Sequence, residues 1–523
     1  MDVLVTLIFS ILAIIILVLA VIYFYATKNY RYWTDRGVPN LKPTFPYGNF
    51  GELIKQKIAL VEYYEKLYKA FKGCPIAGYI SVMEPVLLVR DPEIVKQMLV
   101  KDFDNFHDRG VYFDEEKDPL VAHLFNLTGQ RWHQLRQKIS PTFTSGKMRY
   151  MFPLIKACAE EFQKTVMREI EENGNEIEVK DLNARYTTDI IGSSAFGIDA
   201  GSLAEPEAEM RVIGRKIFPG ETKDGIKNFI FFLSPKLSKF FKVKLVDPFV
   251  EESLIKIVSD TMEYREKNKI ERNDFLQLLI RMKNDGRNDE VKNDGDVELN
   301  LNQLCAQCFV FFVGGFETSA TTMTFTLYEL AKNPSLQKDV ADEVNRVLEA
   351  HNGVMTYESL ADMNLLDMVI AEALRLYPPV PILFRECTRD YTIKGSDFPN
   401  LLSKGHSGDL LVEKGMKVIF PTCAMHRDPE LFPDPERFDP QRFTEEAKAA
   451  RSAFAYLPFG EGPRFCIGMR FGKMQTKAGI ASLISKFELR LGSKSSGKLI
   501  LDPASFVPTV KGGMFISFFP RKN

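Results

Sequence analysis

One ten-residue segment, Phe459 to Gly468, constrains what this chain can fold into more than any other part of the sequence. Its glycines and its proline exclude a regular helix or strand leading into Cys466. Beyond the segment, apolar residues recur at three- and four-residue steps, which is the pattern of an amphipathic helix. We therefore expect Cys466 on a tight loop at a helix N-terminus, where free backbone N–H groups and the helix dipole lower the pKa of a thiol.

Two states of Cys466 are compatible with this position. A thiolate held on such a loop can ligate a metal, and the glycines allow a flat cofactor to approach the backbone closely. A buried structural cysteine is the alternative, and it is the usual state of a lone cysteine. The ten residues by themselves leave both states open.

The first 27 residues differ in character from the rest of the chain. Val3 to Tyr25 are 23 residues without a charge, and 17 of them are Leu, Ile, Val or Phe. As a helix this run is about 35 Å long, and its insertion into a bilayer is favoured by roughly 5 to 10 kcal/mol. A cleaved signal peptide is the alternative, but Met1-Asp2 supplies no basic residue and the run exceeds a normal signal core. Basic residues that place the remaining chain on the cytoplasmic side follow the span: Lys28, Arg31 and Arg36.

Composition describes the remaining chain as globular. Of 523 residues, 45% are hydrophobic and 26% are charged, and the net charge of −1 gives no electrostatic reason to expect a nucleic-acid partner. Seven cysteines, an odd number, fit reduced thiols rather than a disulfide scaffold. Length alone suggests about three domains.

The positions of prolines and glycines along the chain predict its division into segments. Three prolines and a glycine mark residues 28–48 as a stiff linker between an anchor, 1–27, and a body, 49–523. In the body, helical periodicity predominates, and short strand-like runs interrupt it at 86–89 and 514–518. We predict a mainly α fold with small β-sheets.

Residues 229–241 mix phenylalanines with lysines. An ordinary buried helix explains this mixture, and so does a surface that dips into the membrane interface beside the anchor. The sequence does not decide between the two.

A second informative segment runs from Asn302 to Leu330. It is predicted to be one long helix, and because it is apolar nearly all round it belongs in a core. Gly314-Gly315 in its middle cost about 2 kcal/mol relative to alanine. Glu317-Thr318 follow them directly, and space beside an acid and an alcohol is typical of a ligand site. A helix break at the glycine pair is the alternative.

Two further patterns bring charged or polar side chains together. Glu372 and Arg375 share one face of an apolar helix, so we predict a buried pair that needs further hydrogen-bond partners. Trp132 and Arg136 place an indole N–H and a guanidinium on one helical face, and both are donors that suit an anionic ligand.

Together these motifs resemble those of the cytochrome P-450 monooxygenases, in that family's order. Residues 459–468 are similar to the haem-binding loop, and 314–319 to the distal oxygen-binding motif. Residues 109–112, 118–120 and 140–148 look like the insect microsomal branch, which is rich in detoxifying enzymes. The resemblance covers the chain from the anchor to the C-terminus and implies one large haem domain rather than three domains.

The resemblance also implies a role for each matched residue. Cys466 becomes the axial ligand of the iron of haem b, and a thiolate ligand favours O–O bond cleavage. Glu317 and Thr318 relay protons to oxygen. Glu372, Arg375 and Arg437, the last from a Pro-Glu-Arg-Phe element, form a buried triad near the haem. The residues expected around the haem and its propionates are Trp132, Arg136, Arg385, Arg464, Phe459, Gly460 and Gly468.

The segments that the resemblance places over the haem are apolar or aromatic. Because burying an unpaired ion is costly, we expect a neutral, lipophilic substrate, such as a plant toxin or an insecticide-like xenobiotic. The residues expected to contact it are Phe106, Val111, Tyr112, Phe113, Phe312, Gly315, Phe316, Ile382, Leu383 and Phe506.

Electrons must come from a partner, because the chain carries no Rossmann or flavin fingerprint. By resemblance that partner is the NADPH-dependent cytochrome P-450 reductase of the endoplasmic reticulum membrane, with cytochrome b5 as a further candidate. We expect it to dock on the cysteine side, where Arg470, Lys473 and Lys477 form one stripe of a helix. A solvated helix face is the alternative. Residues expected to extend the stripe are Arg131, Lys138, Lys147 and Arg149.

Three other functions remain open at this point. A haem-thiolate isomerase or dehydratase would need no reductase, although it would have no use for the acid–alcohol pair Glu317-Thr318. A non-catalytic haem protein would show no substrate-dependent consumption of NADPH. A monooxygenase of an endogenous hormone or lipid would share the whole machinery and differ only in its substrate.

Overall fold

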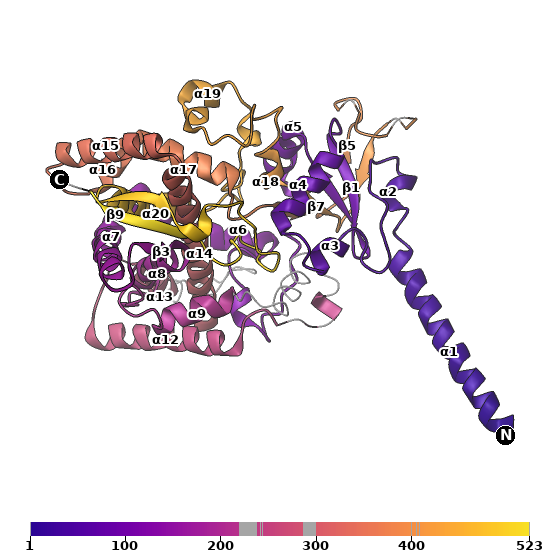
Figure 1. Cartoon of the computed structure of the whole chain (residues 1–523). Helices are drawn as coiled ribbons and strands as arrows, with labels where there is room; N and C mark the ends of the chain where they lie inside the picture. The colour runs from indigo at the N-terminus through magenta and orange to yellow at the C-terminus, as the bar shows by residue number, and fades with distance from the viewer. Residues whose placement is uncertain are drawn as a thin grey trace.

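Helices form most of the molecule, and the strands are short, as the sequence predicts (Figure 1). The computed structural model describes residues 2–218, 238–240, 242, 244–272, 274–285, 300–398, 400–403, 405–406 and 408–521. The segment 229–241 lies largely outside the described residues.

The α-helices begin and end as follows: α1 Asp2–Thr27, α2 Tyr32–Asp35, α3 Gly51–Ile54, α4 Leu60–Ala70, α5 Pro92–Lys96, α6 Gly129–Ile139, α7 Ser145–Asn173, α8 Val179–Ile191, α9 Glu209–Ile217, α12 Pro248–Asn268, α13 Phe275–Asp285, α14 Leu301–Lys332, α15 Pro334–Ala350, α16 Tyr357–Asp362, α17 Asn364–Leu376, α18 Thr422–Met425, α19 Glu445–Ala449 and α20 Met469–Ile484.

The strands form three small sheets. The largest has the order β1-β2-β7-β4, in which β2 and β7 are parallel and the other neighbours are antiparallel. The second has the order β3-β9-β8, and the third pairs β5 with β6. Runs predicted as strands at 86–89 and 514–518 lie in β2 and largely in β9. The strands are β1 Ile76–Ser81, β2 Glu84–Val89, β3 Glu176–Glu178, β4 Leu383–Glu386, β5 Tyr391–Ile393, β6 Leu410–Val412, β7 Lys417–Phe420, β8 Phe487–Leu491 and β9 Phe515–Pro520.

Two hydrophobic cores hold these elements together. One is built by the long helices, including α7, α8, α14 and α20, and the other packs α4 and α5 against the sheet of β1, β2, β7 and β4. Burial of apolar surface stabilises such cores by about 25 cal/mol per Å². The cavity described below is lined by residues of both cores, so its shape depends on how the two pack against each other.

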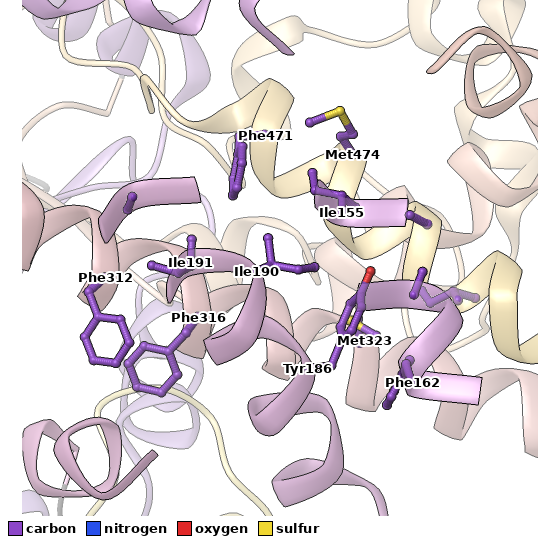
Figure 2. Close-up of a cluster of buried hydrophobic side chains, with 14 of the residues drawn as sticks. Ile155, Phe162, Tyr186, Ile190, Ile191, Phe312, Phe316, Met323, Phe471 and Met474 are labelled. Carbon is purple, nitrogen blue, oxygen red and sulfur yellow. The ribbon is translucent and has the colours of Figure 1, made fainter. Parts of the chain in front are cut away.

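Helix α14 continues through the glycine pair at 314–315, so the predicted long helix is confirmed and the alternative, a break at the glycines, is excluded. One face of the helix belongs to the core. There Phe312 and Phe316, one turn apart, are fully buried, and their ring centroids lie 4.7 Å apart (Figure 2). The face that carries Phe311 and Thr318 points elsewhere, into the cavity.

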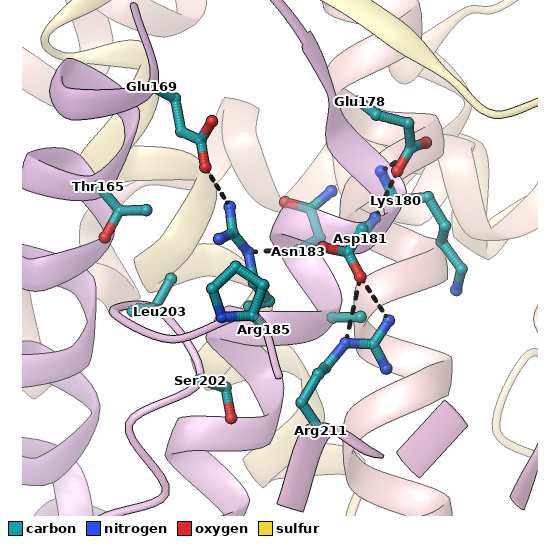
Figure 3. A network of polar contacts seen from close by, with 12 residues as sticks. Thr165, Glu169, Glu178, Lys180, Asp181, Asn183, Arg185, Ser202, Leu203 and Arg211 are labelled. Carbon is teal, nitrogen blue, oxygen red and sulfur yellow. Dashed lines mark hydrogen bonds and ion pairs between the residues drawn. The ribbon is translucent and has the colours of Figure 1, made fainter. Parts of the chain in front are cut away.

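Helix α8 packs along α14 and is held in place by polar contacts on its other sides (Figure 3). Arg185 donates to Glu169 of α7 at 2.8 Å, and Arg211 of α9 donates to Asp181 at 2.7 Å. Toward α14, the Asn183 amide donates to the Thr324 hydroxyl at 3.0 Å. These bonds fix the position of α8 along the axis of α14, and α8 carries Lys180, which contacts Glu317 of α14.

Helix α1 projects away from the body (Figure 1), and its residues 3–27 are long and apolar enough to cross a membrane. The segment 28–48, predicted to be a linker, is instead packed on the body. Trp33 is buried and donates its indole N–H to the Tyr79 carbonyl at 3.0 Å, and Asn40 pairs with Gly78. The segment packs on the body despite its irregular backbone, because the apolar indole of Trp33 fills the space over β1 that Gly78 leaves open.

Candidate active site

A cavity of about 310 Å³ lies between α14 and the loop that carries Cys466. Ligand pockets in proteins begin at about this size. Of the residues predicted around a haem, all eight line this cavity: Cys466, Trp132, Arg136, Arg385, Arg464, Phe459, Gly460 and Gly468.

The cysteine loop has the predicted form. The Cys466 N–H donates to the Phe459 carbonyl at 2.8 Å and closes the loop, and α20 begins three residues later, at Met469. Gly462 has a φ of +72°, and a Cβ there would lie 1.9 Å from the Leu99 carbonyl oxygen. No other residue type can therefore occupy position 462 without moving the backbone.

The pKa of Cys466 differs from the expectation. Burial raises the pKa of the thiol, and the Gly468 N–H and the charges of Arg136 and Arg109 offset this only in part. The protein groups alone therefore do not lower the pKa of this thiol, because its enclosure in the cavity outweighs the Gly468 N–H and the two arginine charges. A coordinating metal cation would be needed to hold the thiolate form.

Four arginines line the cavity, and among the described residues only one has a carboxylate within ion-pair distance. Arg464 lies 3.4 Å from Asp108 and otherwise donates to backbone carbonyls, including that of Leu127 at 2.7 Å. Burial, together with the charge of Arg385, lowers the pKa of Arg464 to about 9. Burial likewise lowers the pKa of Arg385 to about 10 and depresses the pKa values of Arg109 and Arg136.

This cluster suits a flat dianion such as haem. The Arg385 Nε is buried without a hydrogen-bond partner among the residues that the structure describes, so it needs an acceptor that these residues do not supply. Two propionates would pair with the surplus guanidinium charge by charge-assisted hydrogen bonds. Arg109 belongs to this group as well, and the sequence analysis did not predict it. Its guanidinium donates to the Phe125 carbonyl at 2.9 Å, and this bond holds the side chain at the cavity.

The cavity wall on α14 follows a helical period. Phe311, Gly314, Gly315, Thr318 and Thr322 recur at steps of three and four residues, as one face of a helix requires. The Thr318 hydroxyl donates to the Gly314 carbonyl at 2.6 Å. The hydroxyl is thus oriented by the glycine pair while its oxygen remains able to accept a further hydrogen bond.

Glu317 does not share the cavity wall with Thr318. Its carboxylate is buried and accepts a hydrogen bond from the ammonium group of Lys180 on α8 at 2.6 Å. The same ammonium group donates to the Thr321 hydroxyl at 2.7 Å. Glu317 thus points away from the cavity in this conformation while Thr318 lines it, because successive helical residues point about 100° apart, and its part in proton relay stays a prediction. Lys180 lies 137 residues from Glu317 in the sequence, and no motif around it predicts this contact.

Of the residues predicted to contact substrate, Gly315 and Leu383 line the cavity and the others do not. Phe312 and Phe316 belong to the core face of α14 described above. Phe106, Val111 and Ile382 are buried in the core around the largest sheet, and Phe506 packs on the same core. Phe113 packs on the helical core, and Tyr112, half-buried, is also absent from the wall.

Other apolar side chains take their places. Phenylalanines are frequent in this wall, and besides those of the cysteine loop and α20 they come from four separate segments of the chain: Phe125, Phe143, Phe275 and Phe311. Counting Phe311 rather than Phe312 onto the face of Thr318 would have been possible from helical spacing alone. The other three could not be found from sequence, because their place at the cavity depends on how distant segments of the chain pack together.

The buried ion cluster forms with a different third member. Arg375 and Glu372 are both fully buried and bond at 2.7 and 2.8 Å. Arg437 is exposed, and only its backbone carbonyl reaches Arg375. Arg442 instead lies 3.5 Å from Glu372, so the prediction of Arg437 is wrong. The reason is packing, since the turn at Pro440–Phe443 lies against α17 and carries Arg442 inward.

The basic stripe after Cys466 is shorter than predicted. Arg470 and Lys473 are exposed, but Lys477 is buried and pairs with Asp367 at 2.8 Å. Two of the residues expected to extend the stripe, Arg131 and Arg149, are engaged in ion pairs with Glu115 and Glu358. Lys138 and Lys147 are exposed.

Comparison with known proteins agrees with this geometry. The sequence profile of the family described as Cytochrome P450 matches residues 39–516. Cytochrome P450 6a8 of Drosophila melanogaster is 41% identical over 502 residues, which are 95% of this chain and 96% of that protein. Cytochrome P450 6a2 of the same species is 40% identical over 496 residues, 94% and 95% of the two chains. Cytochrome P450 6k1 of Blattella germanica is 39% identical over 521 residues, 97% and 96% of the two chains. A cavity walled by a loop cysteine, a cluster of arginines and the glycine pair of a long helix, in a chain with these relatives, belongs to a member of the cytochrome P450 family of haem-dependent monooxygenases.

Proposed function

We propose that this cytochrome P450 inserts one oxygen atom from O2 into neutral, lipophilic xenobiotics, with electrons from NADPH–cytochrome P450 reductase. One observation carries the substrate class. Apart from the four arginines assigned to the propionates and Lys473, mainly apolar and aromatic side chains line the cavity, and none of the described lining residues is an aspartate or a glutamate. A cationic substrate would therefore lose its hydration without gaining a partner, which is costly.

Haem, when bound, supplies the activation of O2 and the oxidation of the substrate. The chain's own residues would hold it: Cys466 would supply the thiolate ligand of the iron, and Arg109, Arg136, Arg385 and Arg464 with Trp132 would donate to the propionates. The phenylalanines of the wall exclude water and orient the substrate by shape.

Protons are the second contribution of the protein. Thr318 holds one at its hydroxyl, oriented by the Gly314 carbonyl. Glu317 and Lys180 form a buried polar pair one residue away, which can pass protons toward the cavity if the Glu317 side chain changes rotamer. A positioned proton donor contributes about 10²- to 10⁴-fold to a rate.

The proposed location is the endoplasmic reticulum membrane, with α1 as a single span and the body on the cytoplasmic side. The uncharged run of α1 and the basic residues that follow it support this orientation. The reductase, and cytochrome b5 as a second donor, would dock near Cys466, where Arg470 and Lys473 are exposed.

Reconstitution tests the reaction. The purified protein, combined with reductase, NADPH and a panel of lipophilic compounds, is expected to form oxygenated products and to consume NADPH only with substrate and reductase present. Flavonoid- or pyrethroid-like compounds should convert the haem from low to high spin. Turnover without reductase would instead indicate an isomerase or a dehydratase, and preference for a small charged metabolite or for one endogenous lipid would contradict the xenobiotic assignment.

The ligand assignment has a separate test. The ferrous–CO complex should show the red-shifted Soret band of thiolate ligation, and Cys466→Ser should lose it. An unchanged spectrum in the variant would contradict the assignment of Cys466.

Reductase docking is tested at one exposed lysine. Lys473→Glu should raise the apparent Michaelis constant for reductase, and the effect should shrink at high salt, because charges at the rim of an interface act mainly on association. An unchanged constant at low salt would show that Lys473 is only a solvated residue.

A further inference from the structure

Gln475 of α20 is buried between the cysteine helix and α14. Its side chain is fully buried, and it is not part of the cavity wall. Its amide Nε2 donates to the Gly315 carbonyl at 2.7 Å and lies 2.6 Å from the Ser319 hydroxyl oxygen. A carbonyl can only accept, so the nitrogen, not the oxygen, of the amide must face Gly315.

The two contacts of Gln475 span a single helical turn. Gly315 and Ser319 are four residues apart on α14, and Glu317 and Thr318 lie between them. The amide therefore holds the turn that carries the proposed proton donors. Because α20 begins three residues after Cys466, this bond joins the turn to the element that positions the cysteine.

Side chains also reach the carbonyls on either side of Gly315. Thr318 donates to the Gly314 carbonyl at 2.6 Å, and Thr187 of α8 donates to the Phe316 carbonyl at 3.0 Å. Three successive carbonyls of α14 thus accept side-chain hydrogen bonds, each from a different element or turn. Of the three donors, Gln475 alone comes from the helix that follows Cys466.

Stability alone does not account for this amide. Within the described part of the chain the Gln475 Oε1 is buried without a hydrogen-bond partner, and an unsatisfied buried acceptor is destabilising. An apolar side chain of the same length would avoid that cost. A polar group kept at a cost in a protein interior is explained when its bond sets a geometry that the protein uses.

We infer that Gln475 is a positioning residue, which sets the distance between the Cys466 helix and the turn of Thr318 through its hydrogen bonds to Gly315 and Ser319. The inference rests on the proposed proton role of Thr318. Loss of the bond lets this turn drift relative to the cysteine. Protons then reach the distal site out of step with electrons, and reduced oxygen leaves as hydrogen peroxide, which is O2 with two electrons from NADPH and two protons.

The test replaces Gln475 by methionine, which keeps the length of the side chain and removes the donor. In the reconstituted holoenzyme, Gln475→Met should raise the peroxide released per NADPH by about threefold or more, as expected when a reacting group is misplaced by a fraction of an ångström. Haem content, the ferrous–CO band, the substrate dissociation constant and the thermal midpoint should stay close to those of the parent protein. Gln475→Asn, one methylene too short to reach Gly315, should uncouple in the same way, and it serves also if the methionine variant folds poorly.

Two variants measured in parallel make the result decisive. Thr187→Val removes the neighbouring donor from α8 and should leave coupling nearly unchanged, whereas equal uncoupling in Thr187→Val and Gln475→Met would overturn the special link to the cysteine helix.

Thr318→Ala should uncouple strongly. If Thr318→Ala uncouples and both Gln475 variants remain coupled, this inference fails alone; if Thr318→Ala remains coupled, the proposed proton role fails. Uncoupling of the Gln475 variants only in proportion to a lower thermal midpoint would show a structural role and overturn the inference.

Discussion

At the scale of single residues, Gly314 and Gly315 are adjacent on α14 but have different surroundings. A Cβ on Gly314 would meet nothing within 4 Å, because that position faces the cavity. A Cβ on Gly315 would lie 2.3 Å from the Ile191 side chain of α8. The first glycine therefore leaves room for a ligand, and the second allows two helices to pack closely.

This difference predicts opposite effects of two alanine substitutions. Gly314→Ala should stabilise the protein by about 0.5 to 1 kcal/mol through helix propensity, and it should weaken the binding of bulky substrates. Gly315→Ala should destabilise by about 1 to 3 kcal/mol through overpacking against Ile191. Thermal unfolding and substrate-induced spin-state titrations measure both effects, and equal changes in the two variants would contradict the assignment.

The buried cluster around Glu372 gives a second pair of matched variants. Arg442→Met removes a cation 3.5 Å from a fully buried carboxylate and should cost about 1 to 3 kcal/mol of stability. Arg437→Met changes an exposed side chain and should stay within about 0.5 kcal/mol. Denaturant unfolding followed by loss of the haem spectrum measures both, and the reverse order would restore Arg437 to the cluster.

Lys180 is the residue to test for proton supply. Lys180→Met leaves the buried carboxylate of Glu317 without its ammonium partner, and it should lower product formation about tenfold if the pair passes protons. Lys180→Arg, which retains the charge, should recover most of the rate. The measurement is product formed per NADPH with reductase in excess. Full activity of the methionine variant would show that Lys180 and Glu317 do not pass protons to the cavity.

At the scale of elements, the boundary between anchor and body lies just after α1. Helix α1 projects from the body, whereas α2 is attached to β1 through the buried Trp33 (Figure 1). Figure 2 shows the contrasting case of α8, α14 and α20, whose packing surfaces are shared within one core. Elements that share a core are expected to unfold together, and α1 is not part of either core.

Two truncations separate the anchor from the body. Removal of residues 1–27 should leave a protein that folds and retains haem, because Trp33 remains. Removal of residues 1–37 takes the indole away and should cost about 3 to 5 kcal/mol, as for other large buried aromatic residues. Haem retention and the thermal midpoint of both proteins measure this, and similar behaviour of the two would place the boundary elsewhere.

At the scale of the whole molecule, two cores meet at a cavity that gathers positive charge. Four guanidinium groups line it, and burial, together with the charges of neighbouring arginines, lowers the pKa values of Arg464 and Arg109. This arrangement is unfavourable for the protein alone, so a dianionic cofactor should contribute strongly to the stability of the assembled protein.

Neutralising the propionates tests this electrostatic account. Iron protoporphyrin dimethyl ester should bind about 10²- to 10⁴-fold more weakly than haem, because one charge-assisted hydrogen bond, worth about 1.5 to 3 kcal/mol, is lost at each of the two propionates. Arg385→Gln should reduce the difference in binding affinity between haem and its dimethyl ester. Competition for the apoprotein, followed by absorbance, gives the ratio, and equal affinities would show that the arginines do not bind propionates.

The sequence by itself determined the features that depend on neighbours along the chain. The apolar run of α1, the long helix around 302–330, and the glycine-rich turn before Cys466 follow from periodicity and local backbone preference. Spacing within these segments is enough, because a helix or a tight loop is built from contacts over a few residues. The residues predicted around the haem line the cavity for the same reason, since each belongs to a motif recognisable locally.

Only the tertiary structure decided which side chains meet across the molecule. Lys180 reaches Glu317 over 137 residues, and Gln475 reaches Gly315 over 160. The choice of Arg442 over Arg437 in the cluster around Glu372 depends on which face of a turn packs against the core. Such choices are set by the summed packing of distant elements, and no local preference of the chain contains that sum.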